Sequence, residues 1–283
     1  MAAAQRAVRL AEAGNCAEAV PELRKAVRNV TDGDLKKLAG LYGLRCAMMR
    51  NMHDAAEDFL QALRRDFPHD PEVLYQATHA YTDLSSRTSQ ELMHDAPYSV
   101  QAQELVAETL EAQGKWDEAA AQYRKILDAN ANMPGIHYRL GRALLSKPVI
   151  PPDQLQEAKR NFEQELKIDP QNAGAEAVLG EMALRTSNWP EAIDHFKRAI
   201  KLDNSFAEAY VGLGSSLVSE ERYAEAVPVL ETGVKLAPQN PMAHYNLATA
   251  LSRTGHKEEA DREFTIHSKM QEANPAPAAQ PPN

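Results

Sequence analysis

Apolar and polar residues alternate along this chain in a pattern that returns every 34 residues. The pair Leu-Gly at 179–180 returns at 213–214, and the pair Glu-Ala at 191–192 returns at 225–226. Within each copy the apolar positions fall at the intervals of an amphipathic α-helix. A fixed period of this length is typical of stacked helical units, none of which can bury its apolar face alone. The pattern therefore predicts pairs of helices over most of the chain.

The order of residue types within one copy carries a family resemblance. One copy reads Leu213-Gly214, Leu217, Ala226, Leu230 and Pro238. This period and spacing resemble the tetratricopeptide repeat (TPR), a helix-turn-helix unit. The resemblance implies an all-α, TPR-type α-solenoid, a right-handed superhelix of about eight helix-turn-helix repeats.

The repeats follow this pattern unevenly. We expect a TPR solenoid over residues 1–272, with weaker repeats over 1–99 and strong repeats over 100–272. In the third unit Pro97 comes early and leaves room for only a short second helix around Gln90–His94. The residues just before this short helix favour caps and turns, so we expect a weak stacking interface there. They are Ser85, Ser86, Thr88 and Ser89. Residues 273–283 are rich in proline and carry no charge, which predicts a disordered tail.

The fifth unit contains an insertion. Five extra residues lie between its two helices, within Ser146–Asp153, where Pro148, Pro151 and Pro152 exclude helix. The sequence leaves open whether this insertion, or the proline-rich tail, is functional.

Composition and motifs argue against several classes of function. The net charge of −9 and the pI near 5.5 do not suit a surface that binds nucleic acid. No phosphate-binding glycine loop, His-Glu-x-x-His or Gly-x-Ser-x-Gly motif occurs, and the nine histidines show no metal-ligand spacing. We therefore expect no catalytic residues, no metal site and no cofactor, and a protein that is not an enzyme.

The cysteines and the chain start bear on the compartment. Cys16 and Cys46 are too few for a disulfide framework and lie in helix-like segments, so we interpret both as small buried apolar residues. The chain as given shows neither a signal peptide nor an apolar run of about 18 residues, which predicts a cytoplasmic protein. A periplasmic location would require that a leader was trimmed.

The resemblance also implies a binding surface. In this family one stripe of each first helix lines the concave face, where partner peptides usually lie. Carried over to this sequence, the stripe consists of Gln101, Glu104, Glu108, Glu111, Tyr138, Arg142, Glu181, Arg185, Glu208, Tyr245, Thr249 and Arg253. Tyrosine and arginine are common in binding hot spots, which favours a binding surface. The alternative is that these residues only form the solvated faces of exposed helices.

One specialised family site is absent from the sequence. Some TPR proteins hold the C-terminal carboxylate of chaperones with Lys-x3-Asn, an Asn in the next repeat and then Lys-x3-Arg. The corresponding positions here are Tyr138 and Arg142, then Val178, then Glu208 and Gly212, which lack the required lysines and asparagines. We therefore expect no chaperone carboxylate clamp.

The expected function is that of a non-catalytic protein–protein interaction scaffold, which binds a peptide or partner domain on the concave face of the superhelix. One alternative is a structural assembly or cell-envelope factor. Another is a regulatory subunit of an enzyme on another chain. The identity of the partner, the compartment of the full-length gene product and the oligomeric state are left open by the sequence.

Overall fold

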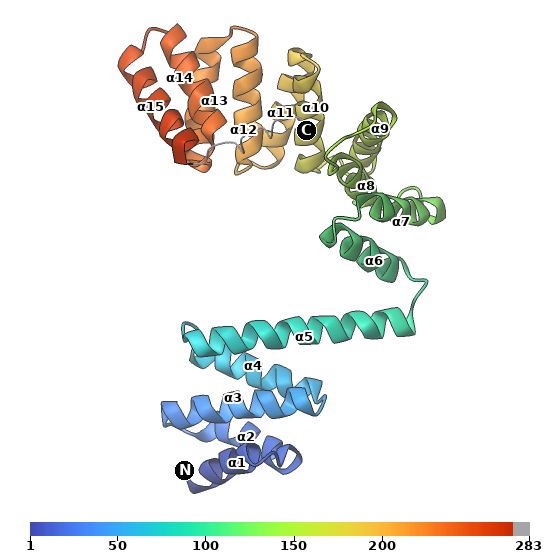
Figure 1. Cartoon of the computed structure of the whole chain (residues 1–283), viewed down its shortest axis with the longest axis vertical. Coiled ribbons are helices and arrows are strands. Elements are labelled where there is room, and N and C mark those ends of the chain that lie inside the picture. Colours follow the sequence, from blue (N-terminus) through green and yellow to red (C-terminus); the bar gives the residue numbers. More distant parts are fainter. Residues whose placement is uncertain (274–283) are drawn as a thin grey trace, which may run out of the picture. The chain divides into compact units, whose positions relative to one another are not determined.

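The computed structural model describes residues 1–273, and every regular element in that range is an α-helix (Figure 1). This confirms the predicted all-α class. Contacts between the helices divide the chain into an N-terminal unit, Met1–Ala102, and a C-terminal unit, Gln103–Asn283. The proline-rich tail predicted for 273–283 lies outside the described residues, apart from Ala273.

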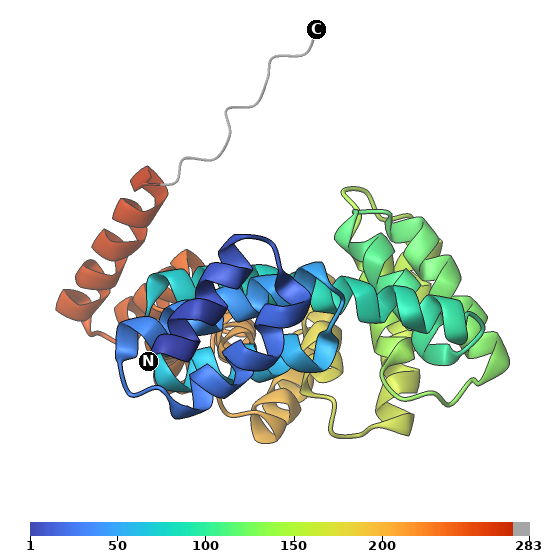
Figure 2. The same cartoon turned by 90° about the horizontal axis from the view of Figure 1, so that it is seen from below.

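The N-terminal unit consists of stacked helices (Figures 1 and 2). In order they are α1 (Ala2–Glu12), α2 (Cys16–Asn29), α3 (Gly33–Met49), α4 (His53–Asp66) and α5 (Pro71–Asp95). The pairs α1–α2 and α3–α4 are helical hairpins. Gly43 permits the close packing of α3 against α4, because a Cβ at this position would lie 2.4 Å from the ring of Phe59. The glycine of the repeat pattern is thus a point of close helix approach.

The predicted third hairpin was wrong. Pro71–Asp95 is one continuous helix of 25 residues, with no break before Gln90. No glycine or proline interrupts the segment after Pro71, and the hydroxyls of Thr88 and Ser89 donate to backbone carbonyls four residues earlier in α5. These residues are therefore satisfied within the helix and do not end it.

Because α5 has no second helix, one of its faces stays open. Tyr81, ten residues after Pro71, is 52% exposed. Leu251, ten residues after Pro241, is 4% exposed because a second helix covers it. The third repeat therefore consists of one long helix without a second helix packed on it.

The cysteines also differ from the prediction. Cys16 of α2 and Cys46 of α3 are buried, as expected, but they form a disulfide bond with each other. The bond joins the first hairpin to the second. A count of two cysteines does not show that they face each other, because that depends on how α2 packs against α3.

Up to Ala273 the C-terminal unit contains five hairpins, and the first helix of the first hairpin spans the unit boundary. Their helices are α6 (Val100–Ala112), α7 (Trp116–Ala129), α8 (Ile136–Leu145), α9 (Pro152–Ile168), α10 (Ala173–Arg185), α11 (Trp189–Leu202), α12 (Ala207–Ser219), α13 (Tyr223–Leu236), α14 (Pro241–Arg253) and α15 (Lys257–Ala273). From α7 onwards each helix packs against the next along the chain (Figure 1). First helices of consecutive hairpins, such as α10 and α12, also touch.

Phe196 joins two of these hairpins. It projects from α11, is 3% exposed, and fills the space left by two glycines. A Cβ at Gly180 of α10 would lie 2.9 Å from its ring, and a Cβ at Gly212 of α12 would lie 2.3 Å from it. Phe196 is thus buried between its own hairpin and the next.

Candidate functional site

The predicted binding residues lie on the first helices of the five C-terminal hairpins. We call these residues the inner stripe. It comprises Gln101, Glu104, Glu108 and Glu111 on α6, Tyr138 and Arg142 on α8, Glu181 and Arg185 on α10, Glu208 on α12, and Tyr245, Thr249 and Arg253 on α14. All twelve side chains are exposed or half-buried, so none of them is buried in the core. Gln101 falls on the N-terminal side of the unit boundary, within α6.

The acidic part of the inner stripe has a basic neighbour that the sequence interpretation missed. The Nη1 atom of Arg139 lies 2.6 Å from Glu108 Oε1, and its Nε atom lies 3.9 Å from Glu104 Oε1. Arg139 follows Tyr138 directly and its long side chain reaches across from α8. The acidic cluster is therefore partly neutralised within the protein itself.

Tyr138 and Arg142 form a connected pair on α8. The Arg142 guanidinium lies over the Tyr138 ring, 5.9 Å from its centroid. The ring meets Phe162 edge-on at 5.8 Å, and a Cβ at Gly174 would lie 2.6 Å from the Tyr138 hydroxyl oxygen. Tyr138 is thus held between α9 and the start of α10, which fixes the position of its ring within the inner stripe.

A buried carboxylate fixes the start of α8. Glu165 of α9 is fully buried, and its two carboxylate oxygens accept hydrogen bonds from the backbone N–H groups of Gly135, at 2.8 Å, and Tyr138, at 3.2 Å. These donors belong to the first turn of a helix, where negative charge is favourable. Sequence reasoning missed Glu165. Its only signal is a charged residue three positions after Phe162, on the apolar side of its helix.

Four other side chains of the inner stripe have local partners. Arg185 Nη2 lies 2.7 Å from Glu181 Oε1, an exposed pair worth a few tenths of a kcal/mol. Arg253 lies 5.6 Å from the ring centroid of Tyr223, and Tyr245 contacts Phe264 and His267. These contacts orient the side chains without burying them.

A cavity of about 230 Å³ opens beside three residues of the inner stripe. It lies between α8, the α8–α9 connection, the start of α9, and α10. Its lining consists of Arg142, Leu145, Ser146, Ile150, Leu155, Val178, Glu181, Met182 and Arg185. The walls are thus mainly aliphatic and the charged groups come from the inner stripe. Sequence reasoning found these charged groups, but not the cavity, whose wall depends on the path of the inserted loop.

Three hairpins carry a polar pair at equivalent positions, three residues before the Leu-Gly slot or its counterpart. His137 Nδ1 lies 2.7 Å from Asn161 Oδ1. Glu176 carboxylate oxygens lie 2.5 Å from His195 Nδ1 and 2.8 Å from Arg198 Nε, and His244 Nδ1 lies 2.5 Å from the Glu263 carboxylate. Their recurrence at one place in the repeat indicates that they hold the two helices of a hairpin together.

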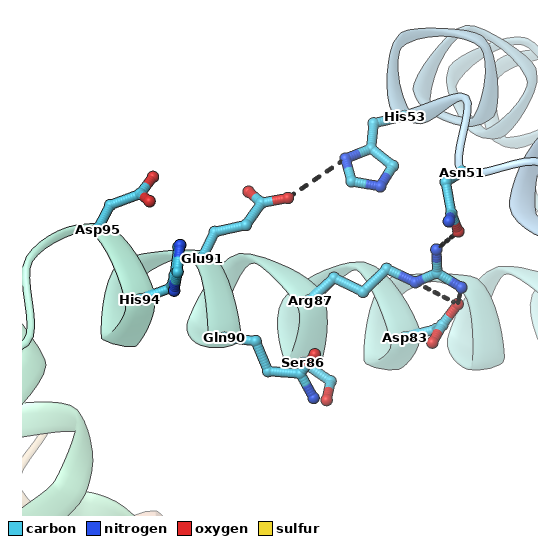
Figure 3. A pocket seen from close by; sticks show the side chains of 9 residues that line it. All are labelled: Asn51, His53, Asp83, Ser86, Arg87, Gln90, Glu91, His94 and Asp95. Carbon is cyan, nitrogen blue, oxygen red and sulfur yellow. Dashed lines mark hydrogen bonds and ion pairs between the residues drawn. The ribbon is translucent and has the colours of Figure 1, made fainter.

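The N-terminal unit contains a larger polar hollow of about 720 Å³ along the distal half of α5 (Figure 3). Arg87 there pairs with Asp83 at 3.0 Å and with Asn51, while His53 Nδ1 lies 3.9 Å from Glu91 Oε1. Within residues 1–273, no group of three or more His, Cys, Asp or Glu side chains is arranged to hold a metal ion. In the same range, no helix combines the length and hydrophobicity of a membrane span.

Family models for the tetratricopeptide repeat match residues 105–148, 153–205 and 217–265, which together make up about half of the chain. A search of curated proteins finds no match. All three segments lie in the C-terminal unit, where the 34-residue pattern is most regular.

Solved structures agree with the family models. MamA is 23% identical with a TM-score of 0.52, covering 59% of this chain and 95% of its own. MamA from residue 41 to its end, from Desulfovibrio magneticus RS-1, is 19% identical with a TM-score of 0.53 and coverages of 62% and 97%. YrrB, described as a TPR protein with an unusual peptide-binding site, is 20% identical with a TM-score of 0.54 and coverages of 66% and 93%. These likenesses bear on the fold alone. Together with the matched segments, they make this chain a multi-repeat member of the tetratricopeptide repeat family.

Proposed function

We propose that this protein is a non-catalytic interaction scaffold, which binds a peptide segment of a partner protein along the inner stripe. The observation that carries the proposal is that each first helix has one face buried in hairpin packing and a neighbouring face left exposed. Leu179 and Gly180 of α10 are buried in hairpin packing, whereas Glu181 and Arg185 of the same helix stay exposed. The stripe runs over five successive first helices, so an extended segment would meet a polar side chain at each repeat and a tyrosine on α8 and α14.

Charge along the stripe suggests how such a segment is oriented. The α6 portion is acidic, although Arg139 offsets part of its charge. The later portion carries Arg142, Arg185 and Arg253. Exposed charges of this kind act mainly on association rate and orientation, while tyrosines that lose water on binding contribute more to affinity. The partner segment should therefore be basic at one end and acidic or aromatic at the other.

Partner capture followed by paired variants tests this proposal. The partner is isolated by affinity purification from the native cell, identified by mass spectrometry, and its binding rates are measured. The pair Glu104→Lys and Glu108→Lys should slow association and weaken its salt dependence. The pair Tyr138→Ala and Arg142→Ala should raise the dissociation rate. Unchanged binding in both, with helicity preserved, would show that the partner uses another surface.

The disulfide favours a second candidate, a structural assembly or cell-envelope factor that works in an oxidising compartment. Disulfide bonds form and persist in such compartments and are rare in the cytosol. The Cys16–Cys46 bond is buried and joins two hairpins, as a structural bond does. Alkylation of denatured protein from native cells provides the test. We expect both thiols to react only after reduction, and reaction without a reductant would argue against this candidate.

A further inference from the structure

The cavity beside α8 exists because this hairpin differs from the others. In the other six hairpins three residues join the two helices, whereas six residues, 146–151, join α8 to α9. Helix α9 is also longer, with 17 residues against 14 in α7 and α11. The longer connection supplies Ser146 and Ile150 to the cavity lining, and Leu155 follows directly after the three residues, 152–154, by which α9 is extended at its start. The insertion is therefore what gives the inner stripe a pocket.

The size of the cavity limits what it can take. At about 230 Å³ it is smaller than the roughly 300–1,000 Å³ of typical small-molecule sites. It has room for one large side chain. Leu145, Ile150, Leu155, Val178 and Met182 surround that space with aliphatic and thioether groups. An apolar side chain entering it leaves water and meets adaptable walls.

The charges at the rim favour an acidic neighbour to that side chain. Arg185 already pairs with Glu181 at 2.7 Å. Arg142 lies over the Tyr138 ring, and in the described part of the chain no carboxylate pairs with it. A guanidinium at the mouth of an apolar cavity suits a carboxylate, which it can hold through two parallel hydrogen bonds.

We infer that this cavity is the specificity pocket of the inner stripe: it receives one large apolar side chain of a partner peptide, while Arg142 holds the carboxylate of an adjacent Asp or Glu. The inference rests on the proposed function, since it assumes that a peptide lies along the stripe. It adds the sequence feature by which that peptide is selected, a large apolar residue beside an acidic one.

A random-peptide phage library, panned against the full chain, is the probe for this motif. Four variants are panned in parallel. Val178→Trp fills the cavity, Ile150→Ser removes part of its apolar wall, and Arg142→Glu reverses the charge at its mouth. Arg160→Glu, at an exposed position of α9 outside the cavity lining, is the matched control. Circular dichroism checks that each variant keeps the helicity of the wild type.

Wild type and the control should enrich peptides with a large apolar residue next to Asp or Glu. Val178→Trp and Ile150→Ser should lose the apolar preference, and Arg142→Glu should exchange the acidic preference for a basic one. In fluorescence anisotropy, replacing the apolar residue of a selected peptide by alanine should weaken wild-type binding by about tenfold or more.

Two results would overturn the inference, and they differ in meaning for the proposed function. If peptides are enriched but the same motif survives in all three cavity variants, the inner stripe binds peptides without this pocket. If neither wild type nor any variant enriches a peptide motif, the pocket falls together with the proposed peptide binding. Because Ile150→Ser and Val178→Trp disturb the cavity in opposite ways, one misfolded variant leaves the other to decide.

Discussion

The contact between Phe196 and Gly212 predicts that Gly212→Ala destabilises the wild-type protein but stabilises the Phe196→Ala variant. Phe196→Ala removes a ring that is 3% exposed and leaves a cavity between α10 and α12, at a cost of about 3–5 kcal/mol. Gly212→Ala places a Cβ 2.3 Å from that ring. Overpacking of this kind costs about 1–3 kcal/mol, and the better helix propensity of alanine returns about 1 kcal/mol. In wild type we therefore expect a loss of up to about 2 kcal/mol.

In the Phe196→Ala background the same change at Gly212 should stabilise the protein. The ring is gone, so the methyl group fills part of the cavity and the propensity gain of about 1 kcal/mol is no longer opposed. The two substitutions should thus be coupled by about 1–3 kcal/mol in a double-mutant cycle. Phe206→Ala is the comparison, because Phe206 is only half-buried at the N-terminus of α12 and should cost much less.

Denaturant titration followed by tryptophan fluorescence measures these differences. The chain has two tryptophans, Trp116 and Trp189, and both lie in the C-terminal unit, so the signal reports that unit alone. Equal effects of Gly212→Ala in the two backgrounds would refute the contact. Equal losses from Phe196→Ala and Phe206→Ala would show that the assigned repeat frame is shifted.

Three further predictions follow from other features. Replacing Cys16 and Cys46 by alanine removes a cross-link between residues 30 positions apart, which should lower the free energy of unfolding of the N-terminal unit by about 3.5 kcal/mol. An unchanged melting midpoint by circular dichroism would contradict this. Tyr123 of α7 is fully buried. Burial raises the pKa of its hydroxyl to about 12, so the stability that the neutral form contributes is complete below about pH 10 and is lost as pH rises towards 12. Wild type should therefore lose about 2 kcal/mol relative to Tyr123→Phe between about pH 10 and pH 12, and parallel pH profiles would refute it. We also expect residues 1–97 to unfold before 100–272 once the disulfide is reduced. Circular dichroism should then show an early transition that Trp116 and Trp189 fluorescence does not report, and coincident curves would count against this.

The fold could be predicted from the sequence because the same packing pattern occurs in several repeats. The glycine of the Leu-Gly pair and the large apolar position occupied by Phe196 recur at a fixed spacing, and each must pack against a neighbouring copy. The prediction for α5 was wrong because Thr88 and Ser89 were weighed by their average preference for turns. Without a glycine or proline to stop the helix, their hydroxyls donate to its own backbone carbonyls.

The candidate site was readable only in part. The exposure of Arg142 and Arg185 follows from their place on the helix, since the stripe beside a buried one faces outward. The cavity between them depends on where the inserted loop carries Ile150, which no periodic pattern encodes. Glu165 was passed over because a glutamate on a helix is usually solvated, and only the packing of α9 against the start of α8 shows its two backbone partners.

Site-specific photo-crosslinking in the native cell tests the central claim, that a partner lies along the inner stripe. A photoreactive amino acid replaces Glu181 or Tyr245 on first helices, and in matched controls it replaces Asp194 on α11 or Glu231 on α13, which are also exposed. After irradiation, adducts are identified by mass spectrometry. We predict that Glu181 and Tyr245 yield the same cross-linked partner and that the two control positions yield none. Adducts formed from Asp194 and Glu231, but not from Glu181 and Tyr245, would contradict the account.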